Sequence, residues 1–303
     1  MKNILLIGGT GFLGSAVVRE LARRPATADC CFTLPTRRRE KAKHLIVLPT
    51  ATVLDADVHD PATLARLMAG QDAVISMVGI LKGGEGEPYG AGFARAHVEL
   101  PRKIAAAAKA AGVRRVLHVS ALKAAADAPS GYLRTKAAGE AVLQQAGLDL
   151  TIFRPSVIFG PGDAFLTLFA KMARIAPFFP LAGADARFQP VWLEDVAAAI
   201  ADSLLRFDSI GATYELCGPK QYRLRELVSY AAAVSGHPRE VIGLPEAVGW
   251  LQAWAMEFIP NGPMTRDNIR SMRVPSVCEG GCELPFRRDA TALEAIAPGY
   301  LRS

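Results

Sequence analysis

Three glycines spaced three residues apart stand where the first predicted strand meets the first predicted helix. The apolar run at 3–8 predicts the strand, and Gly8, Gly11 and Gly14 lead into an amphipathic helix predicted over 12–24. Such a turn needs a residue that tolerates positive φ, and bare backbone lets another group come close. The free N–H groups of a helix start attract phosphate. We therefore predict a dinucleotide pyrophosphate site rather than an unliganded glycine turn, formed by Gly8, Thr10, Gly11, Phe12, Leu13 and Gly14.

Apolar runs alternate with helical patterns through the first 155 residues. We predict strands at 3–8, 30–35, 52–57, 73–78, 113–119 and 149–154, and helices near 12–24, 61–69, 93–111 and 131–146. This alternation predicts an α/β fold, a Rossmann-type doubly wound parallel sheet with a smaller, partly helical C-terminal region. We expect a dinucleotide-binding domain over 1–158, completed by 186–217, and a smaller substrate or partner region over 159–185 and 218–303. Within these, Phe188–Trp192 is predicted to be a returning strand and Asp195 the cap of the next helix.

The end of the second predicted strand distinguishes between two dinucleotides. NAD-binding proteins usually carry an acidic residue there, which holds the ribose 2′-hydroxyl. This chain has Arg37, Arg38 and Arg39 instead. A guanidinium pairs well with a 2′-phosphate, so NADP(H) is favoured over NAD(H). The alternative is a solvated basic turn.

The next two strand ends supply further predicted cofactor contacts. Asp57 and Val58 follow the third strand, where they would meet the adenine. Val78 and Gly79 follow the fourth, where the chain would pass under the cofactor.

Charge and cysteine content exclude several other classes. The net charge is +6, and the first fifty residues, with nine basic and three acidic side chains, hold the whole excess. A local cluster of this kind indicates a phosphate pocket, not the basic stripe of a nucleic-acid-binding protein. The five cysteines do not form a disulfide framework, and Cys278 and Cys282 lack the further ligands that zinc needs. We expect free thiols and no metal.

The start of the chain bears on its location. Lys2 leads directly into an apolar strand, and no apolar run reaches the roughly 20 residues that span a bilayer. We therefore expect no signal peptide or membrane-spanning helix, and a cytoplasmic location.

Ser120, Tyr132 and Lys136 form a candidate catalytic set. Tyr132 and Lys136 lie four residues apart at the start of a predicted helix, and therefore on one face. A nearby ammonium would lower the pKa of the phenol, whose reference value is about 10. Ser120 ends the fifth predicted strand, where its hydroxyl could orient a carbonyl while hydride passes to or from a nicotinamide. Alternatively, the Tyr and Lys pair binds cofactor ribose without turnover.

The sequence resembles the short-chain dehydrogenase/reductase superfamily, and in particular its atypical branch typified by the nucleotide-binding accessory subunit (alpha subcomplex subunit 9) of respiratory complex I. The glycine loop and Tyr-x-x-x-Lys are shared by the whole superfamily, and later strings point to the branch. The similar segments are Gly8–Gly14, Val78–Leu81, His118–Leu122, Ser130–Lys136, Arg154–Gly160, Gln189–Val196, Thr265–Asp267, Ala292–Ile296 and Tyr300–Leu301.

This resemblance adds three expectations. It implies that Lys136 holds the nicotinamide ribose and that the segment containing Pro155 and Ile158 touches the nicotinamide amide. It implies a nucleotide kept as a structural element, as in the complex I accessory subunit. Ser120 precedes Tyr132 by only twelve residues, about half the gap of catalytic sugar-modifying relatives, which leaves turnover open.

Three functions therefore compete. The first is an NADP(H)-binding accessory, assembly or redox-sensing factor linked to complex I or ubiquinone metabolism. The second is an active NADP-dependent oxidoreductase on a quinone-like, lipid or carbonyl substrate. The third is a nucleotide-sugar epimerase or dehydratase, for which we find no second cluster suited to a pyrophosphate.

Two further features have alternative interpretations. Residues 244–259 place Val248, Leu251, Ala255 and Phe258 on one helical face, which could rest on the inner face of a membrane or pack in a core. The helix lacks a Lys/Arg-rich polar face, so core packing is at least as well supported. His97, a lone histidine among apolar residues, is expected to serve packing rather than chemistry.

Overall fold

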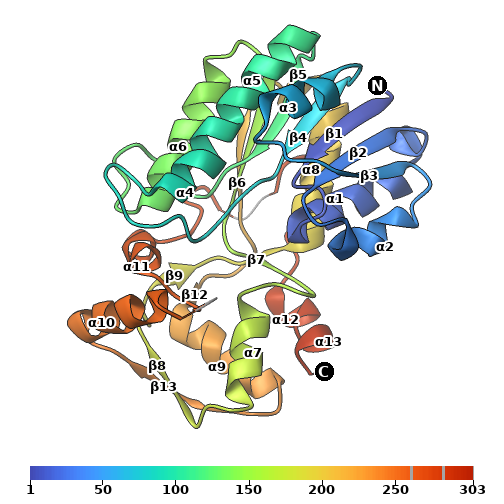
Figure 1. Cartoon of the computed structure of the whole chain (residues 1–303). Helices are drawn as coiled ribbons and strands as arrows, with labels where there is room; N and C mark the ends of the chain where they lie inside the picture. The colour runs from blue at the N-terminus through green and yellow to red at the C-terminus, as the bar shows by residue number, and fades with distance from the viewer. Residues whose placement is uncertain (260–261, 282–283, 303) are drawn as a thin grey trace.

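A parallel sheet of seven strands forms the centre of the computed structural model, which describes residues 1–259, 262–281 and 284–302 (Figure 1). The order across the sheet is β3-β2-β1-β4-β5-β6-β11, and every neighbouring pair is parallel. The strands are β1 (Asn3–Ile7), β2 (Cys31–Thr36), β3 (Ala51–Asp55), β4 (Ala73–Ser76), β5 (Arg115–Val119), β6 (Asp149–Pro155) and β11 (Thr213–Leu216). The predicted Rossmann-type sheet is confirmed.

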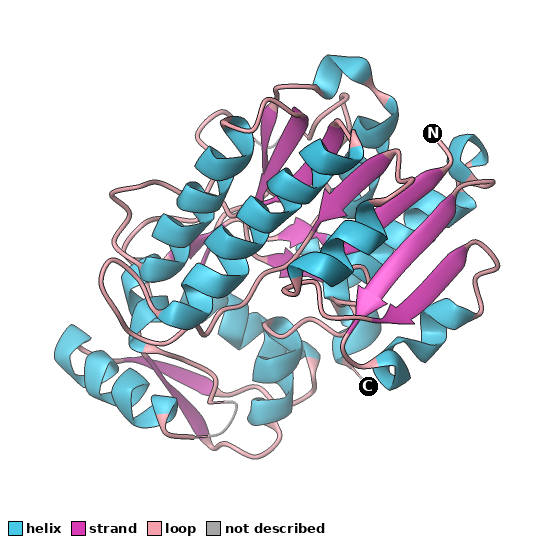
Figure 2. Cartoon of the chain, turned by 45° about the horizontal axis from the view of Figure 1, so that its top comes forward, coloured by secondary structure: helices cyan, strands magenta, loops and turns pink. Residues whose placement is uncertain are grey.

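Helices cover both faces of the sheet, as Figure 2 shows. Alternate residues of β1 point to opposite sides, Ile4 and Leu6 to one core cluster and Leu5 and Ile7 to the other. The first cluster packs against α1 (Phe12–Arg23), α2 (Lys43–Ile46) and α8 (Leu193–Leu205). The second packs against α3 (Pro61–Met68), α5 (Leu100–Ala111) and α6 (Gly131–Gln144). The order of strands reverses between β1 and β4, where ligands of such sheets bind.

The helix predicted over 93–111 is divided in the structure. It consists of α4 (Ala91–Ala94), a π-helical segment (Arg95–Glu99) and α5. Pro101 lies in the first turn of α5 and has no N–H to donate to the preceding turn. Wide π turns are often found at functional sites, and this one carries His97.

A smaller part of the chain lies below the sheet in Figure 1, on the side to which β6 leads. Its strands form three two-stranded pairs, β7 with β10, β9 with β12 and β8 with β13. The elements are β7 (Ile158–Phe159), α7 (Leu166–Ala173), β8 (Phe178–Leu181), β9 (Arg187–Phe188), β10 (Val191–Trp192), β12 (Tyr222–Arg223), α9 (Leu224–Val234), β13 (Glu240–Gly243), α10 (Glu246–Glu257), α11 (Arg266–Met272), α12 (Leu293–Ile296) and α13 (Pro298–Leu301).

Two expectations for residues 188–195 were wrong. The segment predicted as one returning strand is split into β9 and β10 by Gln189 and by Pro190, which has no N–H for a ladder. Asp195 is not the helix cap, because Trp192 occupies that position of α8. The Asp195 carboxylate instead accepts hydrogen bonds from the backbone N–H (2.8 Å) and hydroxyl (3.0 Å) of Thr291. It ties the C-terminal segment to α8.

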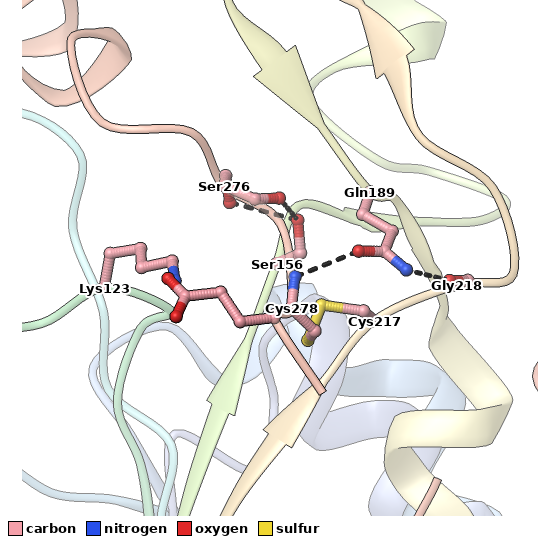
Figure 3. The surroundings of a disulfide bond; sticks show 8 residues. Lys123, Ser156, Gln189, Cys217, Gly218, Ser276 and Cys278 are labelled. Carbon is pink, nitrogen blue, oxygen red and sulfur yellow. Dashed lines mark hydrogen bonds and ion pairs between the residues drawn. A yellow bond between two sulfur atoms is a disulfide. The ribbon is translucent and has the colours of Figure 1, made fainter. Parts of the chain in front are cut away.

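The expectation of free thiols was also wrong for one pair. Cys217, directly after β11, forms a disulfide with Cys278 on the segment between α11 and α12 (Figure 3). Sequence spacing did not indicate this pair, because 61 residues separate the two cysteines and the later segment folds back to the sheet edge. Cys30 and Cys31 are free. Cys282 lies outside the described residues.

The apolar face predicted on residues 244–259 is not part of the core. On α10 only Gly249 and Ala253 are buried, while Val248, Leu251 and, directly after the helix, Phe258 are exposed. The interpretation as a core helix is therefore wrong. Among the described residues, none of the helices is both long and apolar enough to cross a bilayer.

Candidate functional site

The glycine loop has the close backbone contacts that its sequence predicts. Gly8 takes a positive φ of +85°. A Cβ on Gly14 would stand 2.2 Å from the carbonyl oxygen of Gly8, so the first turn of α1 packs directly on the loop. Gly11 caps α1 without a side-chain hydrogen bond. The first turn of α1 thus presents backbone N–H groups beside exposed glycine backbone, which fits a pyrophosphate.

The side chains at the end of β2 lie next to this loop. The Thr10 hydroxyl donates a hydrogen bond to that of Thr36, the last residue of β2 (3.3 Å). Arg37 and Arg38 follow directly and are exposed. Within the described part of the chain neither guanidinium lies within ion-pair distance of a carboxylate. Both arginines thus keep their donors available beside the place where the ribose of a dinucleotide would lie.

The next two strands end close to the same place. Asp57 lies two residues beyond β3, where its carboxylate accepts a hydrogen bond from the His59 backbone (2.9 Å) and stands 3.9 Å from Arg95. Val58 packs against the second core cluster. Val78 lies two residues beyond β4.

Lys136 connects the turn after β4 to the end of β5. Its ammonium donates hydrogen bonds to the carbonyl oxygens of Val78 (3.3 Å) and Val119 (3.1 Å). A Cβ on Gly79 would lie 3.5 Å from the same nitrogen. Burial lowers the pKa of Lys136 to about 8. Of the predicted residues, the structure thus brings Val78, Gly79 and Lys136 together.

Ser120 directly follows Val119 and is buried. Its hydroxyl lacks a hydrogen-bond partner among the described residues. A buried polar group without a partner is costly, and at a site it indicates a place for a ligand atom. The unpartnered hydroxyl beside Lys136 fits a carbonyl group.

The pKa of Tyr132 and its contact with Lys136 differ from what the sequence predicts. The ammonium of Lys136 is bonded to two backbone carbonyls and not to the phenol. Burial raises the pKa of Tyr132 to about 12, in the direction opposite to the one that the sequence predicted. Lys136 therefore does not activate the phenol in this arrangement.

His97 has a structural role, as the sequence suggested, but it is not a lone residue among apolar neighbours. Its Nε2 accepts a hydrogen bond from the backbone N–H of Ile80 (3.1 Å), and its Nδ1 lies 3.1 Å from the Thr135 hydroxyl. Its ring meets that of Tyr132 edge-on, with centroids 5.6 Å apart. Burial lowers the pKa of His97 to about 2, so the ring is neutral. It holds the turn after β4 against α6.

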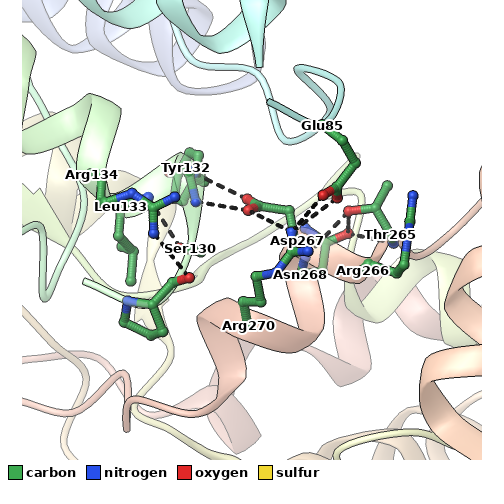
Figure 4. A network of polar contacts seen from close by, with 12 residues as sticks. Glu85, Ser130, Tyr132, Leu133, Arg134, Thr265, Arg266, Asp267, Asn268 and Arg270 are labelled. Atoms are coloured by element: carbon green, nitrogen blue, oxygen red, sulfur yellow. Dashed lines mark hydrogen bonds and ion pairs between the residues drawn. The ribbon is translucent and has the colours of Figure 1, made fainter. Parts of the chain in front are cut away.

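Asp267 is a residue of the site that sequence reasoning missed (Figure 4). Its carboxylate accepts hydrogen bonds from the backbone N–H groups of Gly131 (2.7 Å) and Tyr132 (3.0 Å). α11 thereby caps the helix that carries Tyr132. Thr265, two residues before Asp267, caps α11, and this cap can be predicted from the sequence. The contact of Asp267 with Gly131 and Tyr132 cannot, because more than 130 residues separate them.

Pro155 and Ile158 lie where β6 passes into the smaller part. Pro155 ends β6, and its carbonyl accepts a hydrogen bond from the Leu122 backbone (3.0 Å). Ile158 belongs to β7 and packs against the first core cluster. These contacts give both residues a structural role, and contact with a nicotinamide remains a prediction.

Comparison with known proteins agrees with this geometry. A family model described as NAD(P)H-binding matches residues 8–163. The mitochondrial NADH dehydrogenase [ubiquinone] 1 alpha subcomplex subunit 9 of Rattus norvegicus is 34% identical over 284 residues, which cover 90% of this chain and 72% of the relative. The chain belongs to this NAD(P)H-binding family. The resemblance to the atypical short-chain dehydrogenase/reductase branch is confirmed.

Another relative of this chain is named for an enzymatic activity. A ceramide reductase of Caulobacter vibrioides is 31% identical over 258 residues, covering 84% of this chain and 76% of that protein. Among solved structures, an Escherichia coli NADPH-dependent quinone oxidoreductase complexed with NADPH superposes with a TM-score of 0.77 at 24% identity, covering 99% of this chain and 100% of that one. At this identity the structural match supports the fold alone.

Proposed function

We propose that the chain holds NADP(H) as an accessory, assembly or redox-sensing factor linked to respiratory complex I or ubiquinone metabolism. The link to complex I is carried over from the relatives named as its alpha subcomplex subunit 9. The observation that carries the cofactor choice is the pair Arg37 and Arg38, exposed at the end of β2 beside the glycine loop. Their guanidinium groups would bind the 2′-phosphate that distinguishes NADP(H) from NAD(H).

The proposed cofactor site follows the carboxyl ends of the strands. The loop Gly8–Gly14 would hold the pyrophosphate and Asp57 with Val58 the adenine. Val78 and Gly79 would lie under the cofactor, Lys136 would hold the nicotinamide ribose, and Pro155 with Ile158 would meet the nicotinamide amide.

The state of Tyr132 favours retention of the nucleotide over turnover. When bound, the nicotinamide would supply hydride chemistry, for which the protein would have to provide a proton at the phenol oxygen. Burial keeps the pKa of Tyr132 at about 12, and the Lys136 ammonium is engaged by the carbonyls of Val78 and Val119. A phenol in this state is a weak proton donor at neutral pH.

An active reductase is the second candidate. Its support is the buried Ser120 hydroxyl, which has no partner within the described residues and could bind a carbonyl oxygen. The ceramide reductase among the relatives adds a lipid-type substrate to this candidate. The substrate would enter beside residues 159–185 and 218–303, which we propose as the substrate or partner region. An epimerase or dehydratase remains a further alternative.

One experiment separates the two main candidates. Purified protein is loaded with NADPH, and absorbance at the reduced nicotinamide band is followed after addition of a short-chain ubiquinone or of aldehydes and ketones. The accessory factor retains NADPH through gel filtration, and the acceptors do not oxidise it. Oxidation of NADPH by one of these acceptors, if it is lost in the Tyr132→Phe variant, would overturn the accessory role and establish the reductase.

We also propose that the protein lies in the cytoplasm at the inner face of the membrane, with α10 in contact with lipid. The support is the exposed face of α10, where Leu251 is 62% and Phe258 71% exposed. Trp254 is 45% exposed, and its ring meets that of Phe258 edge-on. Tryptophan favours the lipid interface, and a helix of this kind binds by inserting its apolar face.

Liposome flotation tests this contact. Because its side chain is exposed, Phe258→Glu should leave the free energy of unfolding within about 0.5 kcal/mol of the wild-type value. It should nevertheless reduce flotation with anionic vesicles severalfold. Phe207→Glu, at another exposed apolar position (89% exposed), is the matched control and should float as the wild type does. Equal flotation of both variants and the wild type would contradict the proposed contact.

A further inference from the structure

The disulfide between Cys217 and Cys278 joins the edge of the large sheet to the C-terminal segment 273–281. Cys217 directly follows β11, the neighbour of β6 in the sheet. Cys278 lies between α11 and α12, and the two Cα atoms are 6.1 Å apart. Both cysteines pack with Leu122, two residues beyond Ser120, in a small apolar cluster. The bond therefore lies against the loop that follows β5.

The same segment also contacts the loops that follow β5 and β6. The Ser156 hydroxyl, one residue beyond β6, donates a hydrogen bond to the Ser276 carbonyl (2.8 Å). The Lys123 ammonium pairs with the carboxylate of Glu279 at 2.6 Å. Segment 276–279 thus covers the carboxyl ends of β5, which Ser120 follows, and of β6, which ends at Pro155.

Further noncovalent contacts of the segment run to Gln189 and its neighbours. The Gln189 side chain accepts a hydrogen bond from the Cys278 backbone (2.9 Å) and donates one to the Gly218 carbonyl (2.7 Å). Ser276 exchanges two backbone hydrogen bonds with residues 187 and 189. The two hydrogen bonds of Gln189 are buried, and they hold the segment together with the disulfide. The disulfide is the covalent link that keeps the segment in place.

The two cysteines, both buried, differ slightly in their exposure to solvent. Cys217 is 1% exposed and Cys278 9%. The chain beyond Cys278 is open, since the side chain of Glu279 is 85% exposed and a Cβ on Gly280 or Gly281 would meet open space. An attacking thiolate would therefore reach the Cys278 sulfur first.

We propose that Cys217–Cys278 is a thiol–disulfide exchange site for a dithiol reductant, and that its cleavage releases segment 276–279 from the ends of β5 and β6. One thiolate of the dithiol attacks the sulfur of Cys278, and Cys217 leaves as a thiolate that takes up a proton. The second thiol of the reductant then attacks its own mixed disulfide and frees Cys278. Two electrons and two protons pass to the protein, and the dithiol becomes a disulfide.

Release of the segment would change the cofactor site through Ser156 and Leu122. Ser156 would lose its acceptor at Ser276, and Leu122 would lose part of its packing beside Ser120. Only this consequence for nucleotide binding rests on the proposed function. The opening of the segment itself does not.

The experiment compares the full chain in oxidised and reduced states. Samples held in oxidised glutathione or in dithiothreitol are alkylated and mapped by peptide mass, and hydrogen exchange of amides 276–279 is measured in parallel. We expect alkylation of both cysteines only after dithiol treatment, with exchange of these amides faster by about tenfold or more. The double variant Cys217→Ser, Cys278→Ser should exchange as the reduced protein does in both buffers, whereas Cys31→Ser, a free and exposed cysteine, should behave as wild type.

Three results would overturn the proposal. One is alkylation of Cys217 and Cys278 in oxidised glutathione, and a second is resistance of the bond to the dithiol. The third is equal amide exchange in the two states. NADPH affinity is measured on the same samples and should differ between them by threefold or more, a change of about 0.65 kcal/mol. Absence of NADPH binding in both states would overturn the proposed function and leave the exchange result standing.

Discussion

Replacement of Asp267 by alanine tests how the C-terminal region supports the helix that carries Tyr132. The carboxylate accepts hydrogen bonds from the backbone N–H groups of Gly131 and Tyr132, at 2.7 and 3.0 Å, and the residue is buried. Leaving a buried N–H group without an acceptor costs about 1–3 kcal/mol. Ser130 still caps the N–H of Leu133, so the loss at the start of α6 is limited to these two N–H groups. The Arg270 guanidinium, 3.7 Å from the carboxylate, also loses a partner but keeps Glu85. We expect Asp267→Ala to lower the free energy of unfolding by about 2–4 kcal/mol.

Urea unfolding and amide exchange at Gly131 and Tyr132 measure this loss. Asp267→Asn keeps one acceptor oxygen and should lose roughly half as much. Asp127→Asn is the matched control, because Asp127 is exposed in the loop just before α6 and should stay within about 0.5 kcal/mol of wild type. If Asp267→Ala were as stable as this control, the carboxylate would not be what holds the start of α6.

Two further predictions concern charge. The double variant Arg37→Ala, Arg38→Ala should weaken NADPH binding by about 10–100-fold and leave NADH binding unchanged, because charge-assisted bonds contribute about 1.5–3 kcal/mol. Arg102→Ala is the control, and calorimetry measures both affinities. Equal losses of affinity for the two nucleotides would refute the assignment. Burial lowers the pKa of His97 to about 2 and that of His118 to about 3, below the unfolded value of about 6.5. As pH falls, the unfolded chain therefore binds protons at these two histidines before the folded chain does. The free energy of unfolding should thus decline between about pH 6 and pH 4. His118→Gln should make that decline shallower by about 1.4 kcal/mol per pH unit in urea unfolding, and an unchanged slope would contradict it.

The sequence predicted the features that depend on neighbouring residues and on strand order. The glycine loop lies between β1 and α1 because its residues are adjacent in the chain, and the parallel sheet then brings the ends of β4 and β5 together. Contacts made by the returning C-terminal part could not be predicted. Asp267 reaches α6, and Cys278 reaches Cys217, only after the chain has folded back.

The surroundings of His97 and of the apolar face of α10 could not be predicted, because hydrophobic patterns do not specify what surrounds a residue. The pattern around His97 indicated burial correctly, but it did not indicate the π turn that directs the ring to Ile80 and Thr135. The apolar face of α10 fits a core or a surface contact equally well in sequence. The structure shows that Gly249 and Ala253 are the buried residues of α10 and that Leu251 stays exposed.

The central claim is that the head of α1 binds a diphosphate while Arg37 and Arg38 bind a phosphate on the ribose. Isothermal titration calorimetry of the full chain with NADPH and with NADH tests it most directly. The account predicts heat of association for NADPH and an affinity about tenfold or more above that for NADH. Titrations that show no heat with either nucleotide would contradict the whole account, and tighter binding of NADH would contradict the part played by the two arginines.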